Sequence, residues 1–212
     1  PPEVFTTEWK NPVNATPQDQ RNNLRKAAQL LAEAGWKPQN GVLTNAKGEQ
    51  LAVEILIVQP DFERVVLPFK TNLERLGVRV SVRIVDTSQY QRRTDTFDYD
   101  IIVDSFPQSN SPGNEQRNFW GSAAADTHGS MNSIGIKNPA IDKLIDKIIY
   151  AADREELVAA TRALDRVLLW NYYVIPQWHS PFDRIAVWDM FGRPDKLPEQ
   201  SPSFMRVWWL DA

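Results

Sequence analysis

Residues 51–84 read LAVEILIVQPDFERVVLPFKTNLERLGVRVSVRI, and this stretch decides the fold class. Its first part, 51–59, is a nearly continuous apolar run, which is typical of a strand covered on both faces. A helix capped by Asp61 is expected to follow, and Pro68 should kink or interrupt it. Residues 78–84 alternate between apolar and polar side chains, the period of a strand with one solvated face. Together these segments predict a right-handed βαβ unit.

The flanking sequence extends this pattern into an α/β domain. Residues 1–15 hold three prolines and no period, so we expect an extended lead-in. Thr16 then caps a helix that begins with Pro17 and ends at Gly35. Further elements are expected in chain order: a short helix at 87–93, a strand at 99–104, a helix at 139–151, a helix opening with the capping box 153–156, and strands at 172–178, 185–188 and 205–210.

Composition excludes several classes of function. The chain has 212 residues, 42% of them hydrophobic and 24% charged, as in an ordinary globular protein. A net charge of −3 without a basic patch argues against a nucleic-acid partner. No apolar run approaches the length of about 20 residues that crosses a bilayer. The absence of cysteine removes disulfides, thiolate chemistry and most structural zinc sites.

Residues 99–122, YDIIVDSFPQSNSPGNEQRNFWGS, form the candidate ligand site. They open with the apolar run 101–103, continue with amides, hydroxyls, proline and glycine, and close on Phe119 and Trp120. Many α/β proteins present a ligand site on a polar and aromatic loop that follows a rigid strand. The alternative is a long surface connection without a function of its own.

The sequence carries few signs of catalysis or of a metal site. The only histidines, His128 and His179, lie in no motif with metal-ligand spacing. No nucleophile elbow, phosphate loop or dinucleotide fingerprint occurs. We therefore expect a protein that is not an enzyme and that holds no metal and no cofactor. The alternative is an α/β hydrolase that uses carboxylates between Asp98 and Glu115.

Three segments, taken in order and spacing, resemble the family 5 extracellular solute-binding proteins, the peptide- and nickel-binding receptors of bacterial ABC importers. Residues 76–103, LGVRVSVRIVDTSQYQRRTDTFDYDIIV, are similar to that family's strand, short helix and "FD" strand. Residues 136–179 are similar to its paired helices and the strand that follows them. The block 111–126, SPGNEQRNFWGSAAAD, preceded by 62–78, most resembles the Yej-type subgroup, which is implicated in uptake of peptides and peptide-like microcins.

The resemblance implies a periplasmic binding protein-like lobe of class II type, with a mixed, mostly parallel sheet flanked by helices. It implies residues 16–180 as the second ligand-binding lobe and 181–212 as a segment that returns to a first lobe lying outside this chain. The implied partners are a peptide or peptide-like ligand and the membrane permease subunits of an ABC importer. The implied receptor is periplasmic and monomeric, and it does not bind nucleic acid. The start at Pro1-Pro2 fits a chain whose signal peptide and N-terminal lobe lie elsewhere.

The resemblance also places the ligand wall. In better-known peptide receptors the strand after "FD" ends in a tryptophan, and an aspartate three residues later binds the ligand's amino group. Here Phe106 stands at the tryptophan position and Ser109 at the aspartate position, so the amine-binding carboxylate is missing. Asp104 or Glu115 is expected to replace it. Alternatively, water or the other lobe holds the amino group of the ligand. The expected ligand-binding residues supply aromatic walls, neutral hydrogen-bonding groups and charge: Phe106, Gln108, Ser109, Asn110, Asn114, Glu115, Arg117 and Trp120.

Overall fold

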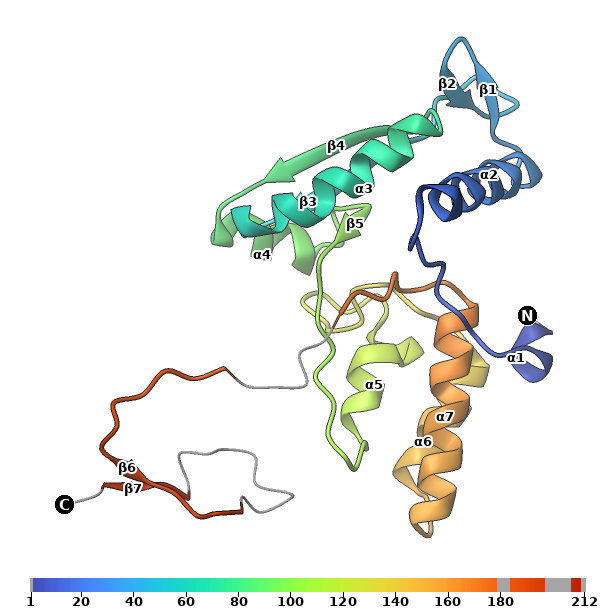
Figure 1. The fold of residues 1–212 in the computed structure, drawn as a ribbon. Coiled ribbons are helices and arrows are strands. Elements are labelled where there is room, and N and C mark those ends of the chain that lie inside the picture. Colours follow the sequence, from blue (N-terminus) through green and yellow to red (C-terminus); the bar gives the residue numbers. More distant parts are fainter. Residues whose placement is uncertain (1, 179–183, 197–206, 211–212) are drawn as a thin grey trace. The chain divides into compact units, whose positions relative to one another are not determined.

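The computed structural model describes residues 2–178, 184–196 and 207–210, and the chain divides into two compact units, Pro1–Ile175 and Pro176–Ala212 (Figure 1). In the described part of the second unit, β6 (Phe191–Gly192) pairs antiparallel with β7 (Trp209–Leu210). The helices and strands of the first unit are, in chain order, α1 (Glu3–Thr6), α2 (Pro17–Glu33), β1 (Lys37–Gln39), β2 (Val42–Thr44), β3 (Ala52–Ile57), η1 (Pro60–Phe62), α3 (Glu63–Arg75), β4 (Arg79–Ile84), α4 (Thr87–Asp95), β5 (Ile101–Ile102), α5 (Glu115–Trp120), η2 (Ser122–Ala124), α6 (Pro139–Ile149) and α7 (Arg154–Trp170).

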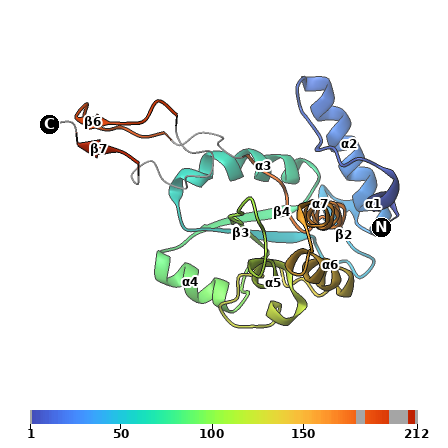
Figure 2. The ribbon, with the colours of Figure 1, turned by 90° about the horizontal axis from the view of Figure 1, so that it is seen from below.

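A parallel sheet in the order β4-β3-β5 forms the centre of the α/β part, and it confirms the βαβ unit. Its register pairs Ile55 with Val82 of β4 and with Ile101 of β5, so these apolar side chains share one face. Figure 2 shows α3 on one side of β3 and β4 and α4 on the other. Ile55, Leu56 and Ile57 are all buried, as expected for a strand with both faces covered.

Helix α3 differs from expectation at two residues. The helix continues through Pro68, so the expected interruption does not occur. Pro68 lacks the N–H that would bond to the carbonyl group of Arg64, but the residues on either side remain helical. Asp61 lies in the η1 turn, and the α3 N-cap residue, Phe62, makes no side-chain cap bond. The helix packs its apolar side on the sheet, with Val66 buried there.

The N-terminal elements follow their capping signals in part. Thr16 and Asp19 form a capping box, in which the Asp19 N–H donates to Thr16 Oγ1 at 3.1 Å and the Thr16 N–H donates to Asp19 Oδ2 at 2.9 Å. The segment expected to be extended contains the helical turn α1, because Arg166 of α7 binds the main-chain carbonyls of Val4 and Thr7. After α2, residues 37–44 form the antiparallel β1–β2 hairpin, in which Lys37 pairs with Thr44 and Gln39 with Val42.

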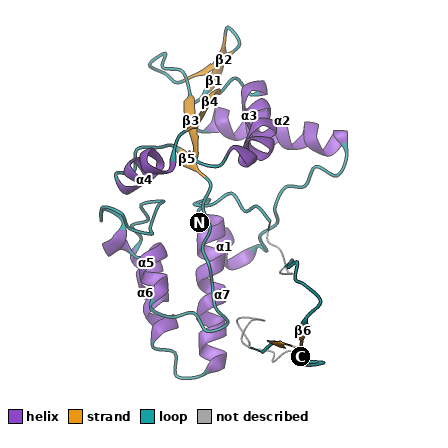
Figure 3. Ribbon diagram, turned by 90° about the vertical axis from the view of Figure 1, so that its left-hand side faces the viewer, coloured by secondary structure: helices purple, strands orange, loops and turns teal. Residues whose placement is uncertain are grey.

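Helices α6 and α7 lie side by side and build a second core (Figure 3). Ile141, Ile145 and Ile148 recur on one face of α6, and all three are buried. They pack with Ala160 and Leu164 of α7, at the i and i+4 positions of that helix. Both helices were expected from this periodicity, and the structure confirms them.

Most of the strand predictions near the C-terminus disagree with the described structure. The described residues 172–178 contain no strand; Tyr172 takes φ +57° after the end of α7, and Pro176 has no N–H to give a ladder. Residues 185–188 are also irregular, and the strand lies at β6 instead. Of the strand expected at 205–210, only 209–210 form a strand, β7; residues 207 and 208 are described but are not strand, and 205 and 206 lie outside the described residues.

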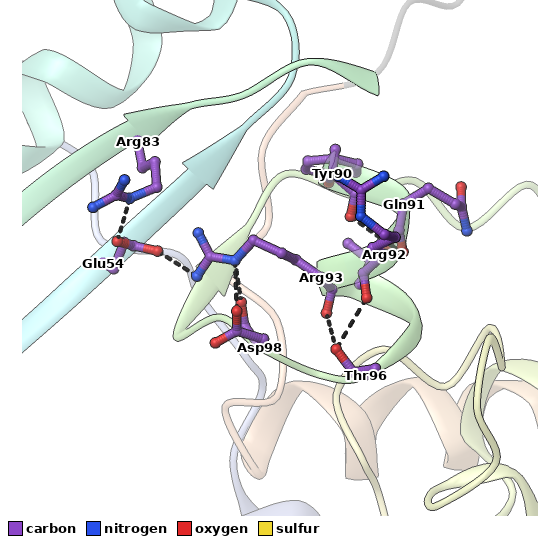
Figure 4. A network of polar contacts seen from close by, with 9 residues as sticks. Glu54, Arg83, Tyr90, Gln91, Arg92, Arg93, Thr96 and Asp98 are labelled. Carbon is purple, nitrogen blue, oxygen red and sulfur yellow. Dashed lines mark hydrogen bonds and ion pairs between the residues drawn. The ribbon is translucent and has the colours of Figure 1, made fainter. Parts of the chain in front are cut away.

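A charged network fixes the position of β5, from which the candidate loop leaves (Figure 4). Arg93 of α4 donates from Nη2 to Glu54 Oε1 at 2.6 Å and from Nε to Asp98 Oδ2 at 2.8 Å, and Arg83 donates to Glu54 Oε2 at 2.9 Å. Burial alone would raise the pKa of Glu54, but the two guanidinium groups lower it below its ordinary value. The carboxylate therefore stays ionised and joins β3, β4 and α4 beside the entry to β5.

Within the described part of the chain, no helix has the length and apolar character needed to cross a membrane.

Candidate functional site

The short helix α5 forms the floor of the candidate site. The sequence suggested an irregular polar loop here, but six of its residues, Glu115–Trp120, are helical. Phe119 and Trp120 on this helix are buried in the α6–α7 core, with exposed fractions of 4% and 6%. A helix this short is held mainly by such tertiary burial, since its own propagation energy is small. The loop is thus fastened at its end by two aromatic side chains.

Phe106 folds back from the loop onto this floor. Its ring centroid lies 4.4 Å from that of Trp120, with the rings tilted by 41°, and 5.7 Å from that of Phe119 in an edge-to-face arrangement. Both distances lie in the range in which aromatic pairs attract. The three rings therefore form one aromatic cluster.

Gln116 is the buried polar residue of the site, and all of its side-chain contacts are with neighbours in the loop and helix. Its Oε1 accepts from the Trp120 Nε1–H at 3.1 Å. Its Nε2 donates to Gln108 Oε1 at 2.6 Å and lies 3.3 Å from Glu115 Oε1. The exposed fraction of Gln116 is 3%, so these bonds form away from water, where each is strengthened.

The loop is also tied to the start of α7. Arg154 Nη1 donates to the main-chain carbonyl of Asn110 at 2.6 Å. Between the loop and this helix lies an open pocket of about 360 Å³, lined by loop and α5 residues on one side and by an α7 face on the other. Leu157, Leu164 and Leu168 supply the apolar part of the α7 wall, and Arg154, Arg162 and Asp165 supply its charges. Burial raises the pKa of Asp165, and the nearby Arg166 offsets part of that effect.

The pocket brings together five of the eight expected ligand-binding residues: Phe106, Gln108, Ser109, Asn110 and Trp120. Ser109 lines the pocket, while its Oγ also accepts from the Ser111 N–H at 3.2 Å. Sequence reasoning missed Gln116 and the polar α7 face, since polar positions on an amphipathic helix are ordinarily solvated.

The other three expected residues do not line the pocket. Glu115 accepts from the Gly113 N–H at 2.8 Å; burial would raise its pKa, but the hydrogen bonds from its own main chain, from Gly113 and from Gln116 lower it. Arg117 forms an ion pair with Asp146 at 2.8 Å. Asn114 is exposed at the start of α5 and makes no side-chain cap bond.

The carboxylates near the loop are similarly occupied. Asp104, proposed as a substitute for the missing amine-binding carboxylate, accepts from Ser133 Oγ at 2.7 Å, and Asp100 accepts from the Glu54 N–H at 2.8 Å. Neither these two residues nor Asp98 nor Glu115 lines the pocket. The geometry therefore offers no observation in favour of a two-carboxylate hydrolase.

His128 belongs to no group of metal-ligating residues in the part of the chain that the structure describes. Over the described ranges no three His, Cys, Asp or Glu residues gather as a metal site would require. His128 is exposed, and His179 lies outside the described residues.

Comparison with known proteins gives a family for this arrangement. The model of a protein family described as "Bacterial extracellular solute-binding proteins, family 5 Middle" matches residues 2–127. A protein of Agrobacterium fabrum named "Probable peptide-binding protein YejA" is 50% identical over 210 residues, which is 99% of this chain and 34% of that protein. Another from the same organism, "Peptidoglycan-binding protein YepA", is 38% identical over 209 residues, 99% of this chain and 34% of that protein.

Among solved structures, the oligopeptide-binding protein AppA from Bacillus subtilis, in complex with a nonapeptide, has a similar fold. Its TM-score is 0.64 at 22% sequence identity, covering 80% of this chain and 33% of AppA. At that identity the likeness shows the fold alone, a periplasmic binding protein-like arrangement of a parallel sheet flanked by helices. The chain spans about a third of the length of the curated relatives it matches.

Proposed function

The chain belongs to the bacterial extracellular solute-binding proteins, family 5, and we propose that it forms one wall of a cleft that binds peptides or peptide-like compounds for import. Among its relatives it is similar to the YejA proteins. The proposed mechanism is closure of two lobes on the ligand about a hinge, without covalent chemistry. The 16–180 region would be the second lobe, and 181–212 would return to the first.

The observation that carries this proposal is the pocket between the loop and α7. An extended peptide needs hydrogen-bonding partners for its main chain and apolar walls for its side chains. The pocket offers both, because Phe106 and Trp120 form an aromatic wall and Gln108, Ser109 and Asn110 carry neutral polar groups beside it. The carboxylates of the loop are bound to protein groups instead, which favours binding over hydrolysis.

The cellular setting is part of the same proposal. A receptor of this family would work in the periplasm and would pass its ligand to the permease subunits of an ABC importer. We propose that it acts as a monomer and has no nucleic-acid partner, in keeping with its net charge of −3. Peptide-like microcins are within the proposed ligand range, since main-chain recognition tolerates different side chains.

Retention of peptides by the full-length protein tests the proposal. The protein is unfolded and refolded to remove any carried ligand, incubated with a tetrapeptide library and separated by gel filtration. Mass spectrometry is expected to find a subset of intact peptides retained by the protein. Retention of no peptide would contradict the peptide-binding function, and peptides shortened by cleavage would favour the hydrolase instead.

A further inference from the structure

Hydrogen bonding fixes which amide atom of Gln108 meets Gln116 and which is left for other partners. Trp120 Nε1–H is a donor only, so the atom of Gln116 that meets it must be the oxygen. The nitrogen of Gln116 then lies on the other side, 3.3 Å from the Glu115 carboxylate, which is an acceptor only when ionised. The orientation of the Gln116 amide is therefore determined from both ends.

The orientation of Gln116 determines that of Gln108. Gln116 Nε2 donates a hydrogen bond to Gln108 at 2.6 Å, so the atom of Gln108 that accepts it must be the side-chain oxygen. The remaining atom, Gln108 Nε2, has no protein partner among the described residues, although Gln108 lines the pocket. A chain of bonds that starts at a buried tryptophan thus leaves two N–H donors without a protein partner on a residue that lines the pocket.

The charged residues on the opposite wall, on α7, also favour a ligand group that accepts hydrogen bonds. Arg154 and Arg162 both line the pocket, and neither has a carboxylate partner within the part of the chain that the structure describes. Asp165 is the one carboxylate among the residues that line it. Two guanidinium groups against one carboxylate make the wall favourable for an anion, and guanidinium groups bind carboxylates well.

We infer that this pocket binds a carboxylate of the peptide through the Gln108 amide and the α7 arginines, with Gln116 as the positioning residue that keeps the Gln108 donors turned inward. The inference rests on the proposed peptide-binding function and names the group recognised at this wall.

The substitution Gln108→Glu tests the direction of this preference. Glutamate keeps an oxygen for Gln116 but replaces the inward donors with a second acceptor. The full-length protein is offered two tetrapeptide libraries: one contains free carboxylates, and in the other every carboxylate is replaced by an amide. We expect the wild type to prefer the first library, and Gln108→Glu to retain it at least about tenfold less.

The controls separate this inference from the function on which it rests. Gln39→Glu on the exposed β1 strand adds the same charge away from the pocket and should leave retention unchanged. A wild type that retains neither library contradicts the proposed function. A wild type that retains both libraries equally, or a Gln108→Glu variant that binds peptides with free carboxylates as well or better, overturns the inference and leaves the function standing.

The positioning role of Gln116 has its own readout. Gln116→Met removes the bonds to Trp120 and Gln108 while it keeps a similar side-chain volume. We expect the indole N–H signal of Trp120 to shift in the NMR spectrum and the preference for free carboxylates to fall toward equality between the libraries. An equal loss of both libraries would show a merely structural residue and would overturn the positioning role.

Discussion

Replacing Asn132 by leucine is expected to lower the free energy of unfolding by about 3 kcal/mol or more, because it leaves buried main-chain groups without partners. Asn132 is fully buried in the connection between α5 and α6. Its Nδ2 donates to the carbonyls of Gly121 at 3.0 Å and Ile136 at 3.1 Å, and its Oδ1 accepts from the Ile136 N–H at 3.0 Å. Leucine has the same number of heavy atoms but is larger, so no cavity forms, and the loss comes from the missing hydrogen bonds together with crowding at this buried site.

Urea denaturation of the full-length protein measures this loss, with attention to the transition that reports the lobe containing α6 and α7. Asn118→Leu is the matched control, since Asn118 is exposed on the neighbouring helix α5. Its effect should stay within about 0.5 kcal/mol of zero. Equal stability of Asn132→Leu and wild type would show that the three bonds do not hold the connection together.

Replacing Phe106 by alanine is expected to weaken binding of the most strongly retained tetrapeptide by roughly 10- to 100-fold, the equivalent of losing one apolar side-chain contact from a binding site. Phe106 supplies the exposed edge of the aromatic wall, whereas Trp120 lies mostly beneath it. Calorimetry on the full-length protein measures the affinity. The effect should appear in affinity more than in stability, because Phe106 is only partly buried.

Phe106→Leu separates the ring from its bulk. Leucine keeps apolar contact with the core but removes aromatic stacking on Trp120, so its affinity should lie between those of alanine and wild type. Thermal unfolding of both variants checks that the lobe remains folded. An unchanged affinity of a folded Phe106→Ala variant would place the ligand away from this wall.

Much of the fold could be predicted because its periodicity is local. The apolar run of β3 and the alternation in β4 each predict a strand by themselves, and the glycine that follows α3 marks the end of the helix between them. Thr16 likewise marks the start of α2 by its own side chain. The prediction of a strand at 172–178 was wrong because β-branched and aromatic composition shows only that a strand is possible. A strand also needs a neighbouring strand with which to pair.

The candidate site was predictable in part for the same reason. The loop from Phe106 to Asn110 follows a buried strand, and its composition indicates a ligand wall. The opposite wall on α7 depends on which face of that helix the loop covers, and this is a tertiary fact. Gln116 was missed because a glutamine in a polar stretch is ordinarily solvated; only the donor of Trp120, one helical turn later, gives it a buried role.

A crystal structure of the full-length protein with a retained tetrapeptide tests the central claim most directly. The claim predicts peptide between two lobes, in contact with the Phe106 ring and with one of its carboxylates within hydrogen-bonding distance of Gln108 Nε2. A peptide bound elsewhere, with the space between the loop and α7 filled by the protein itself, would contradict it.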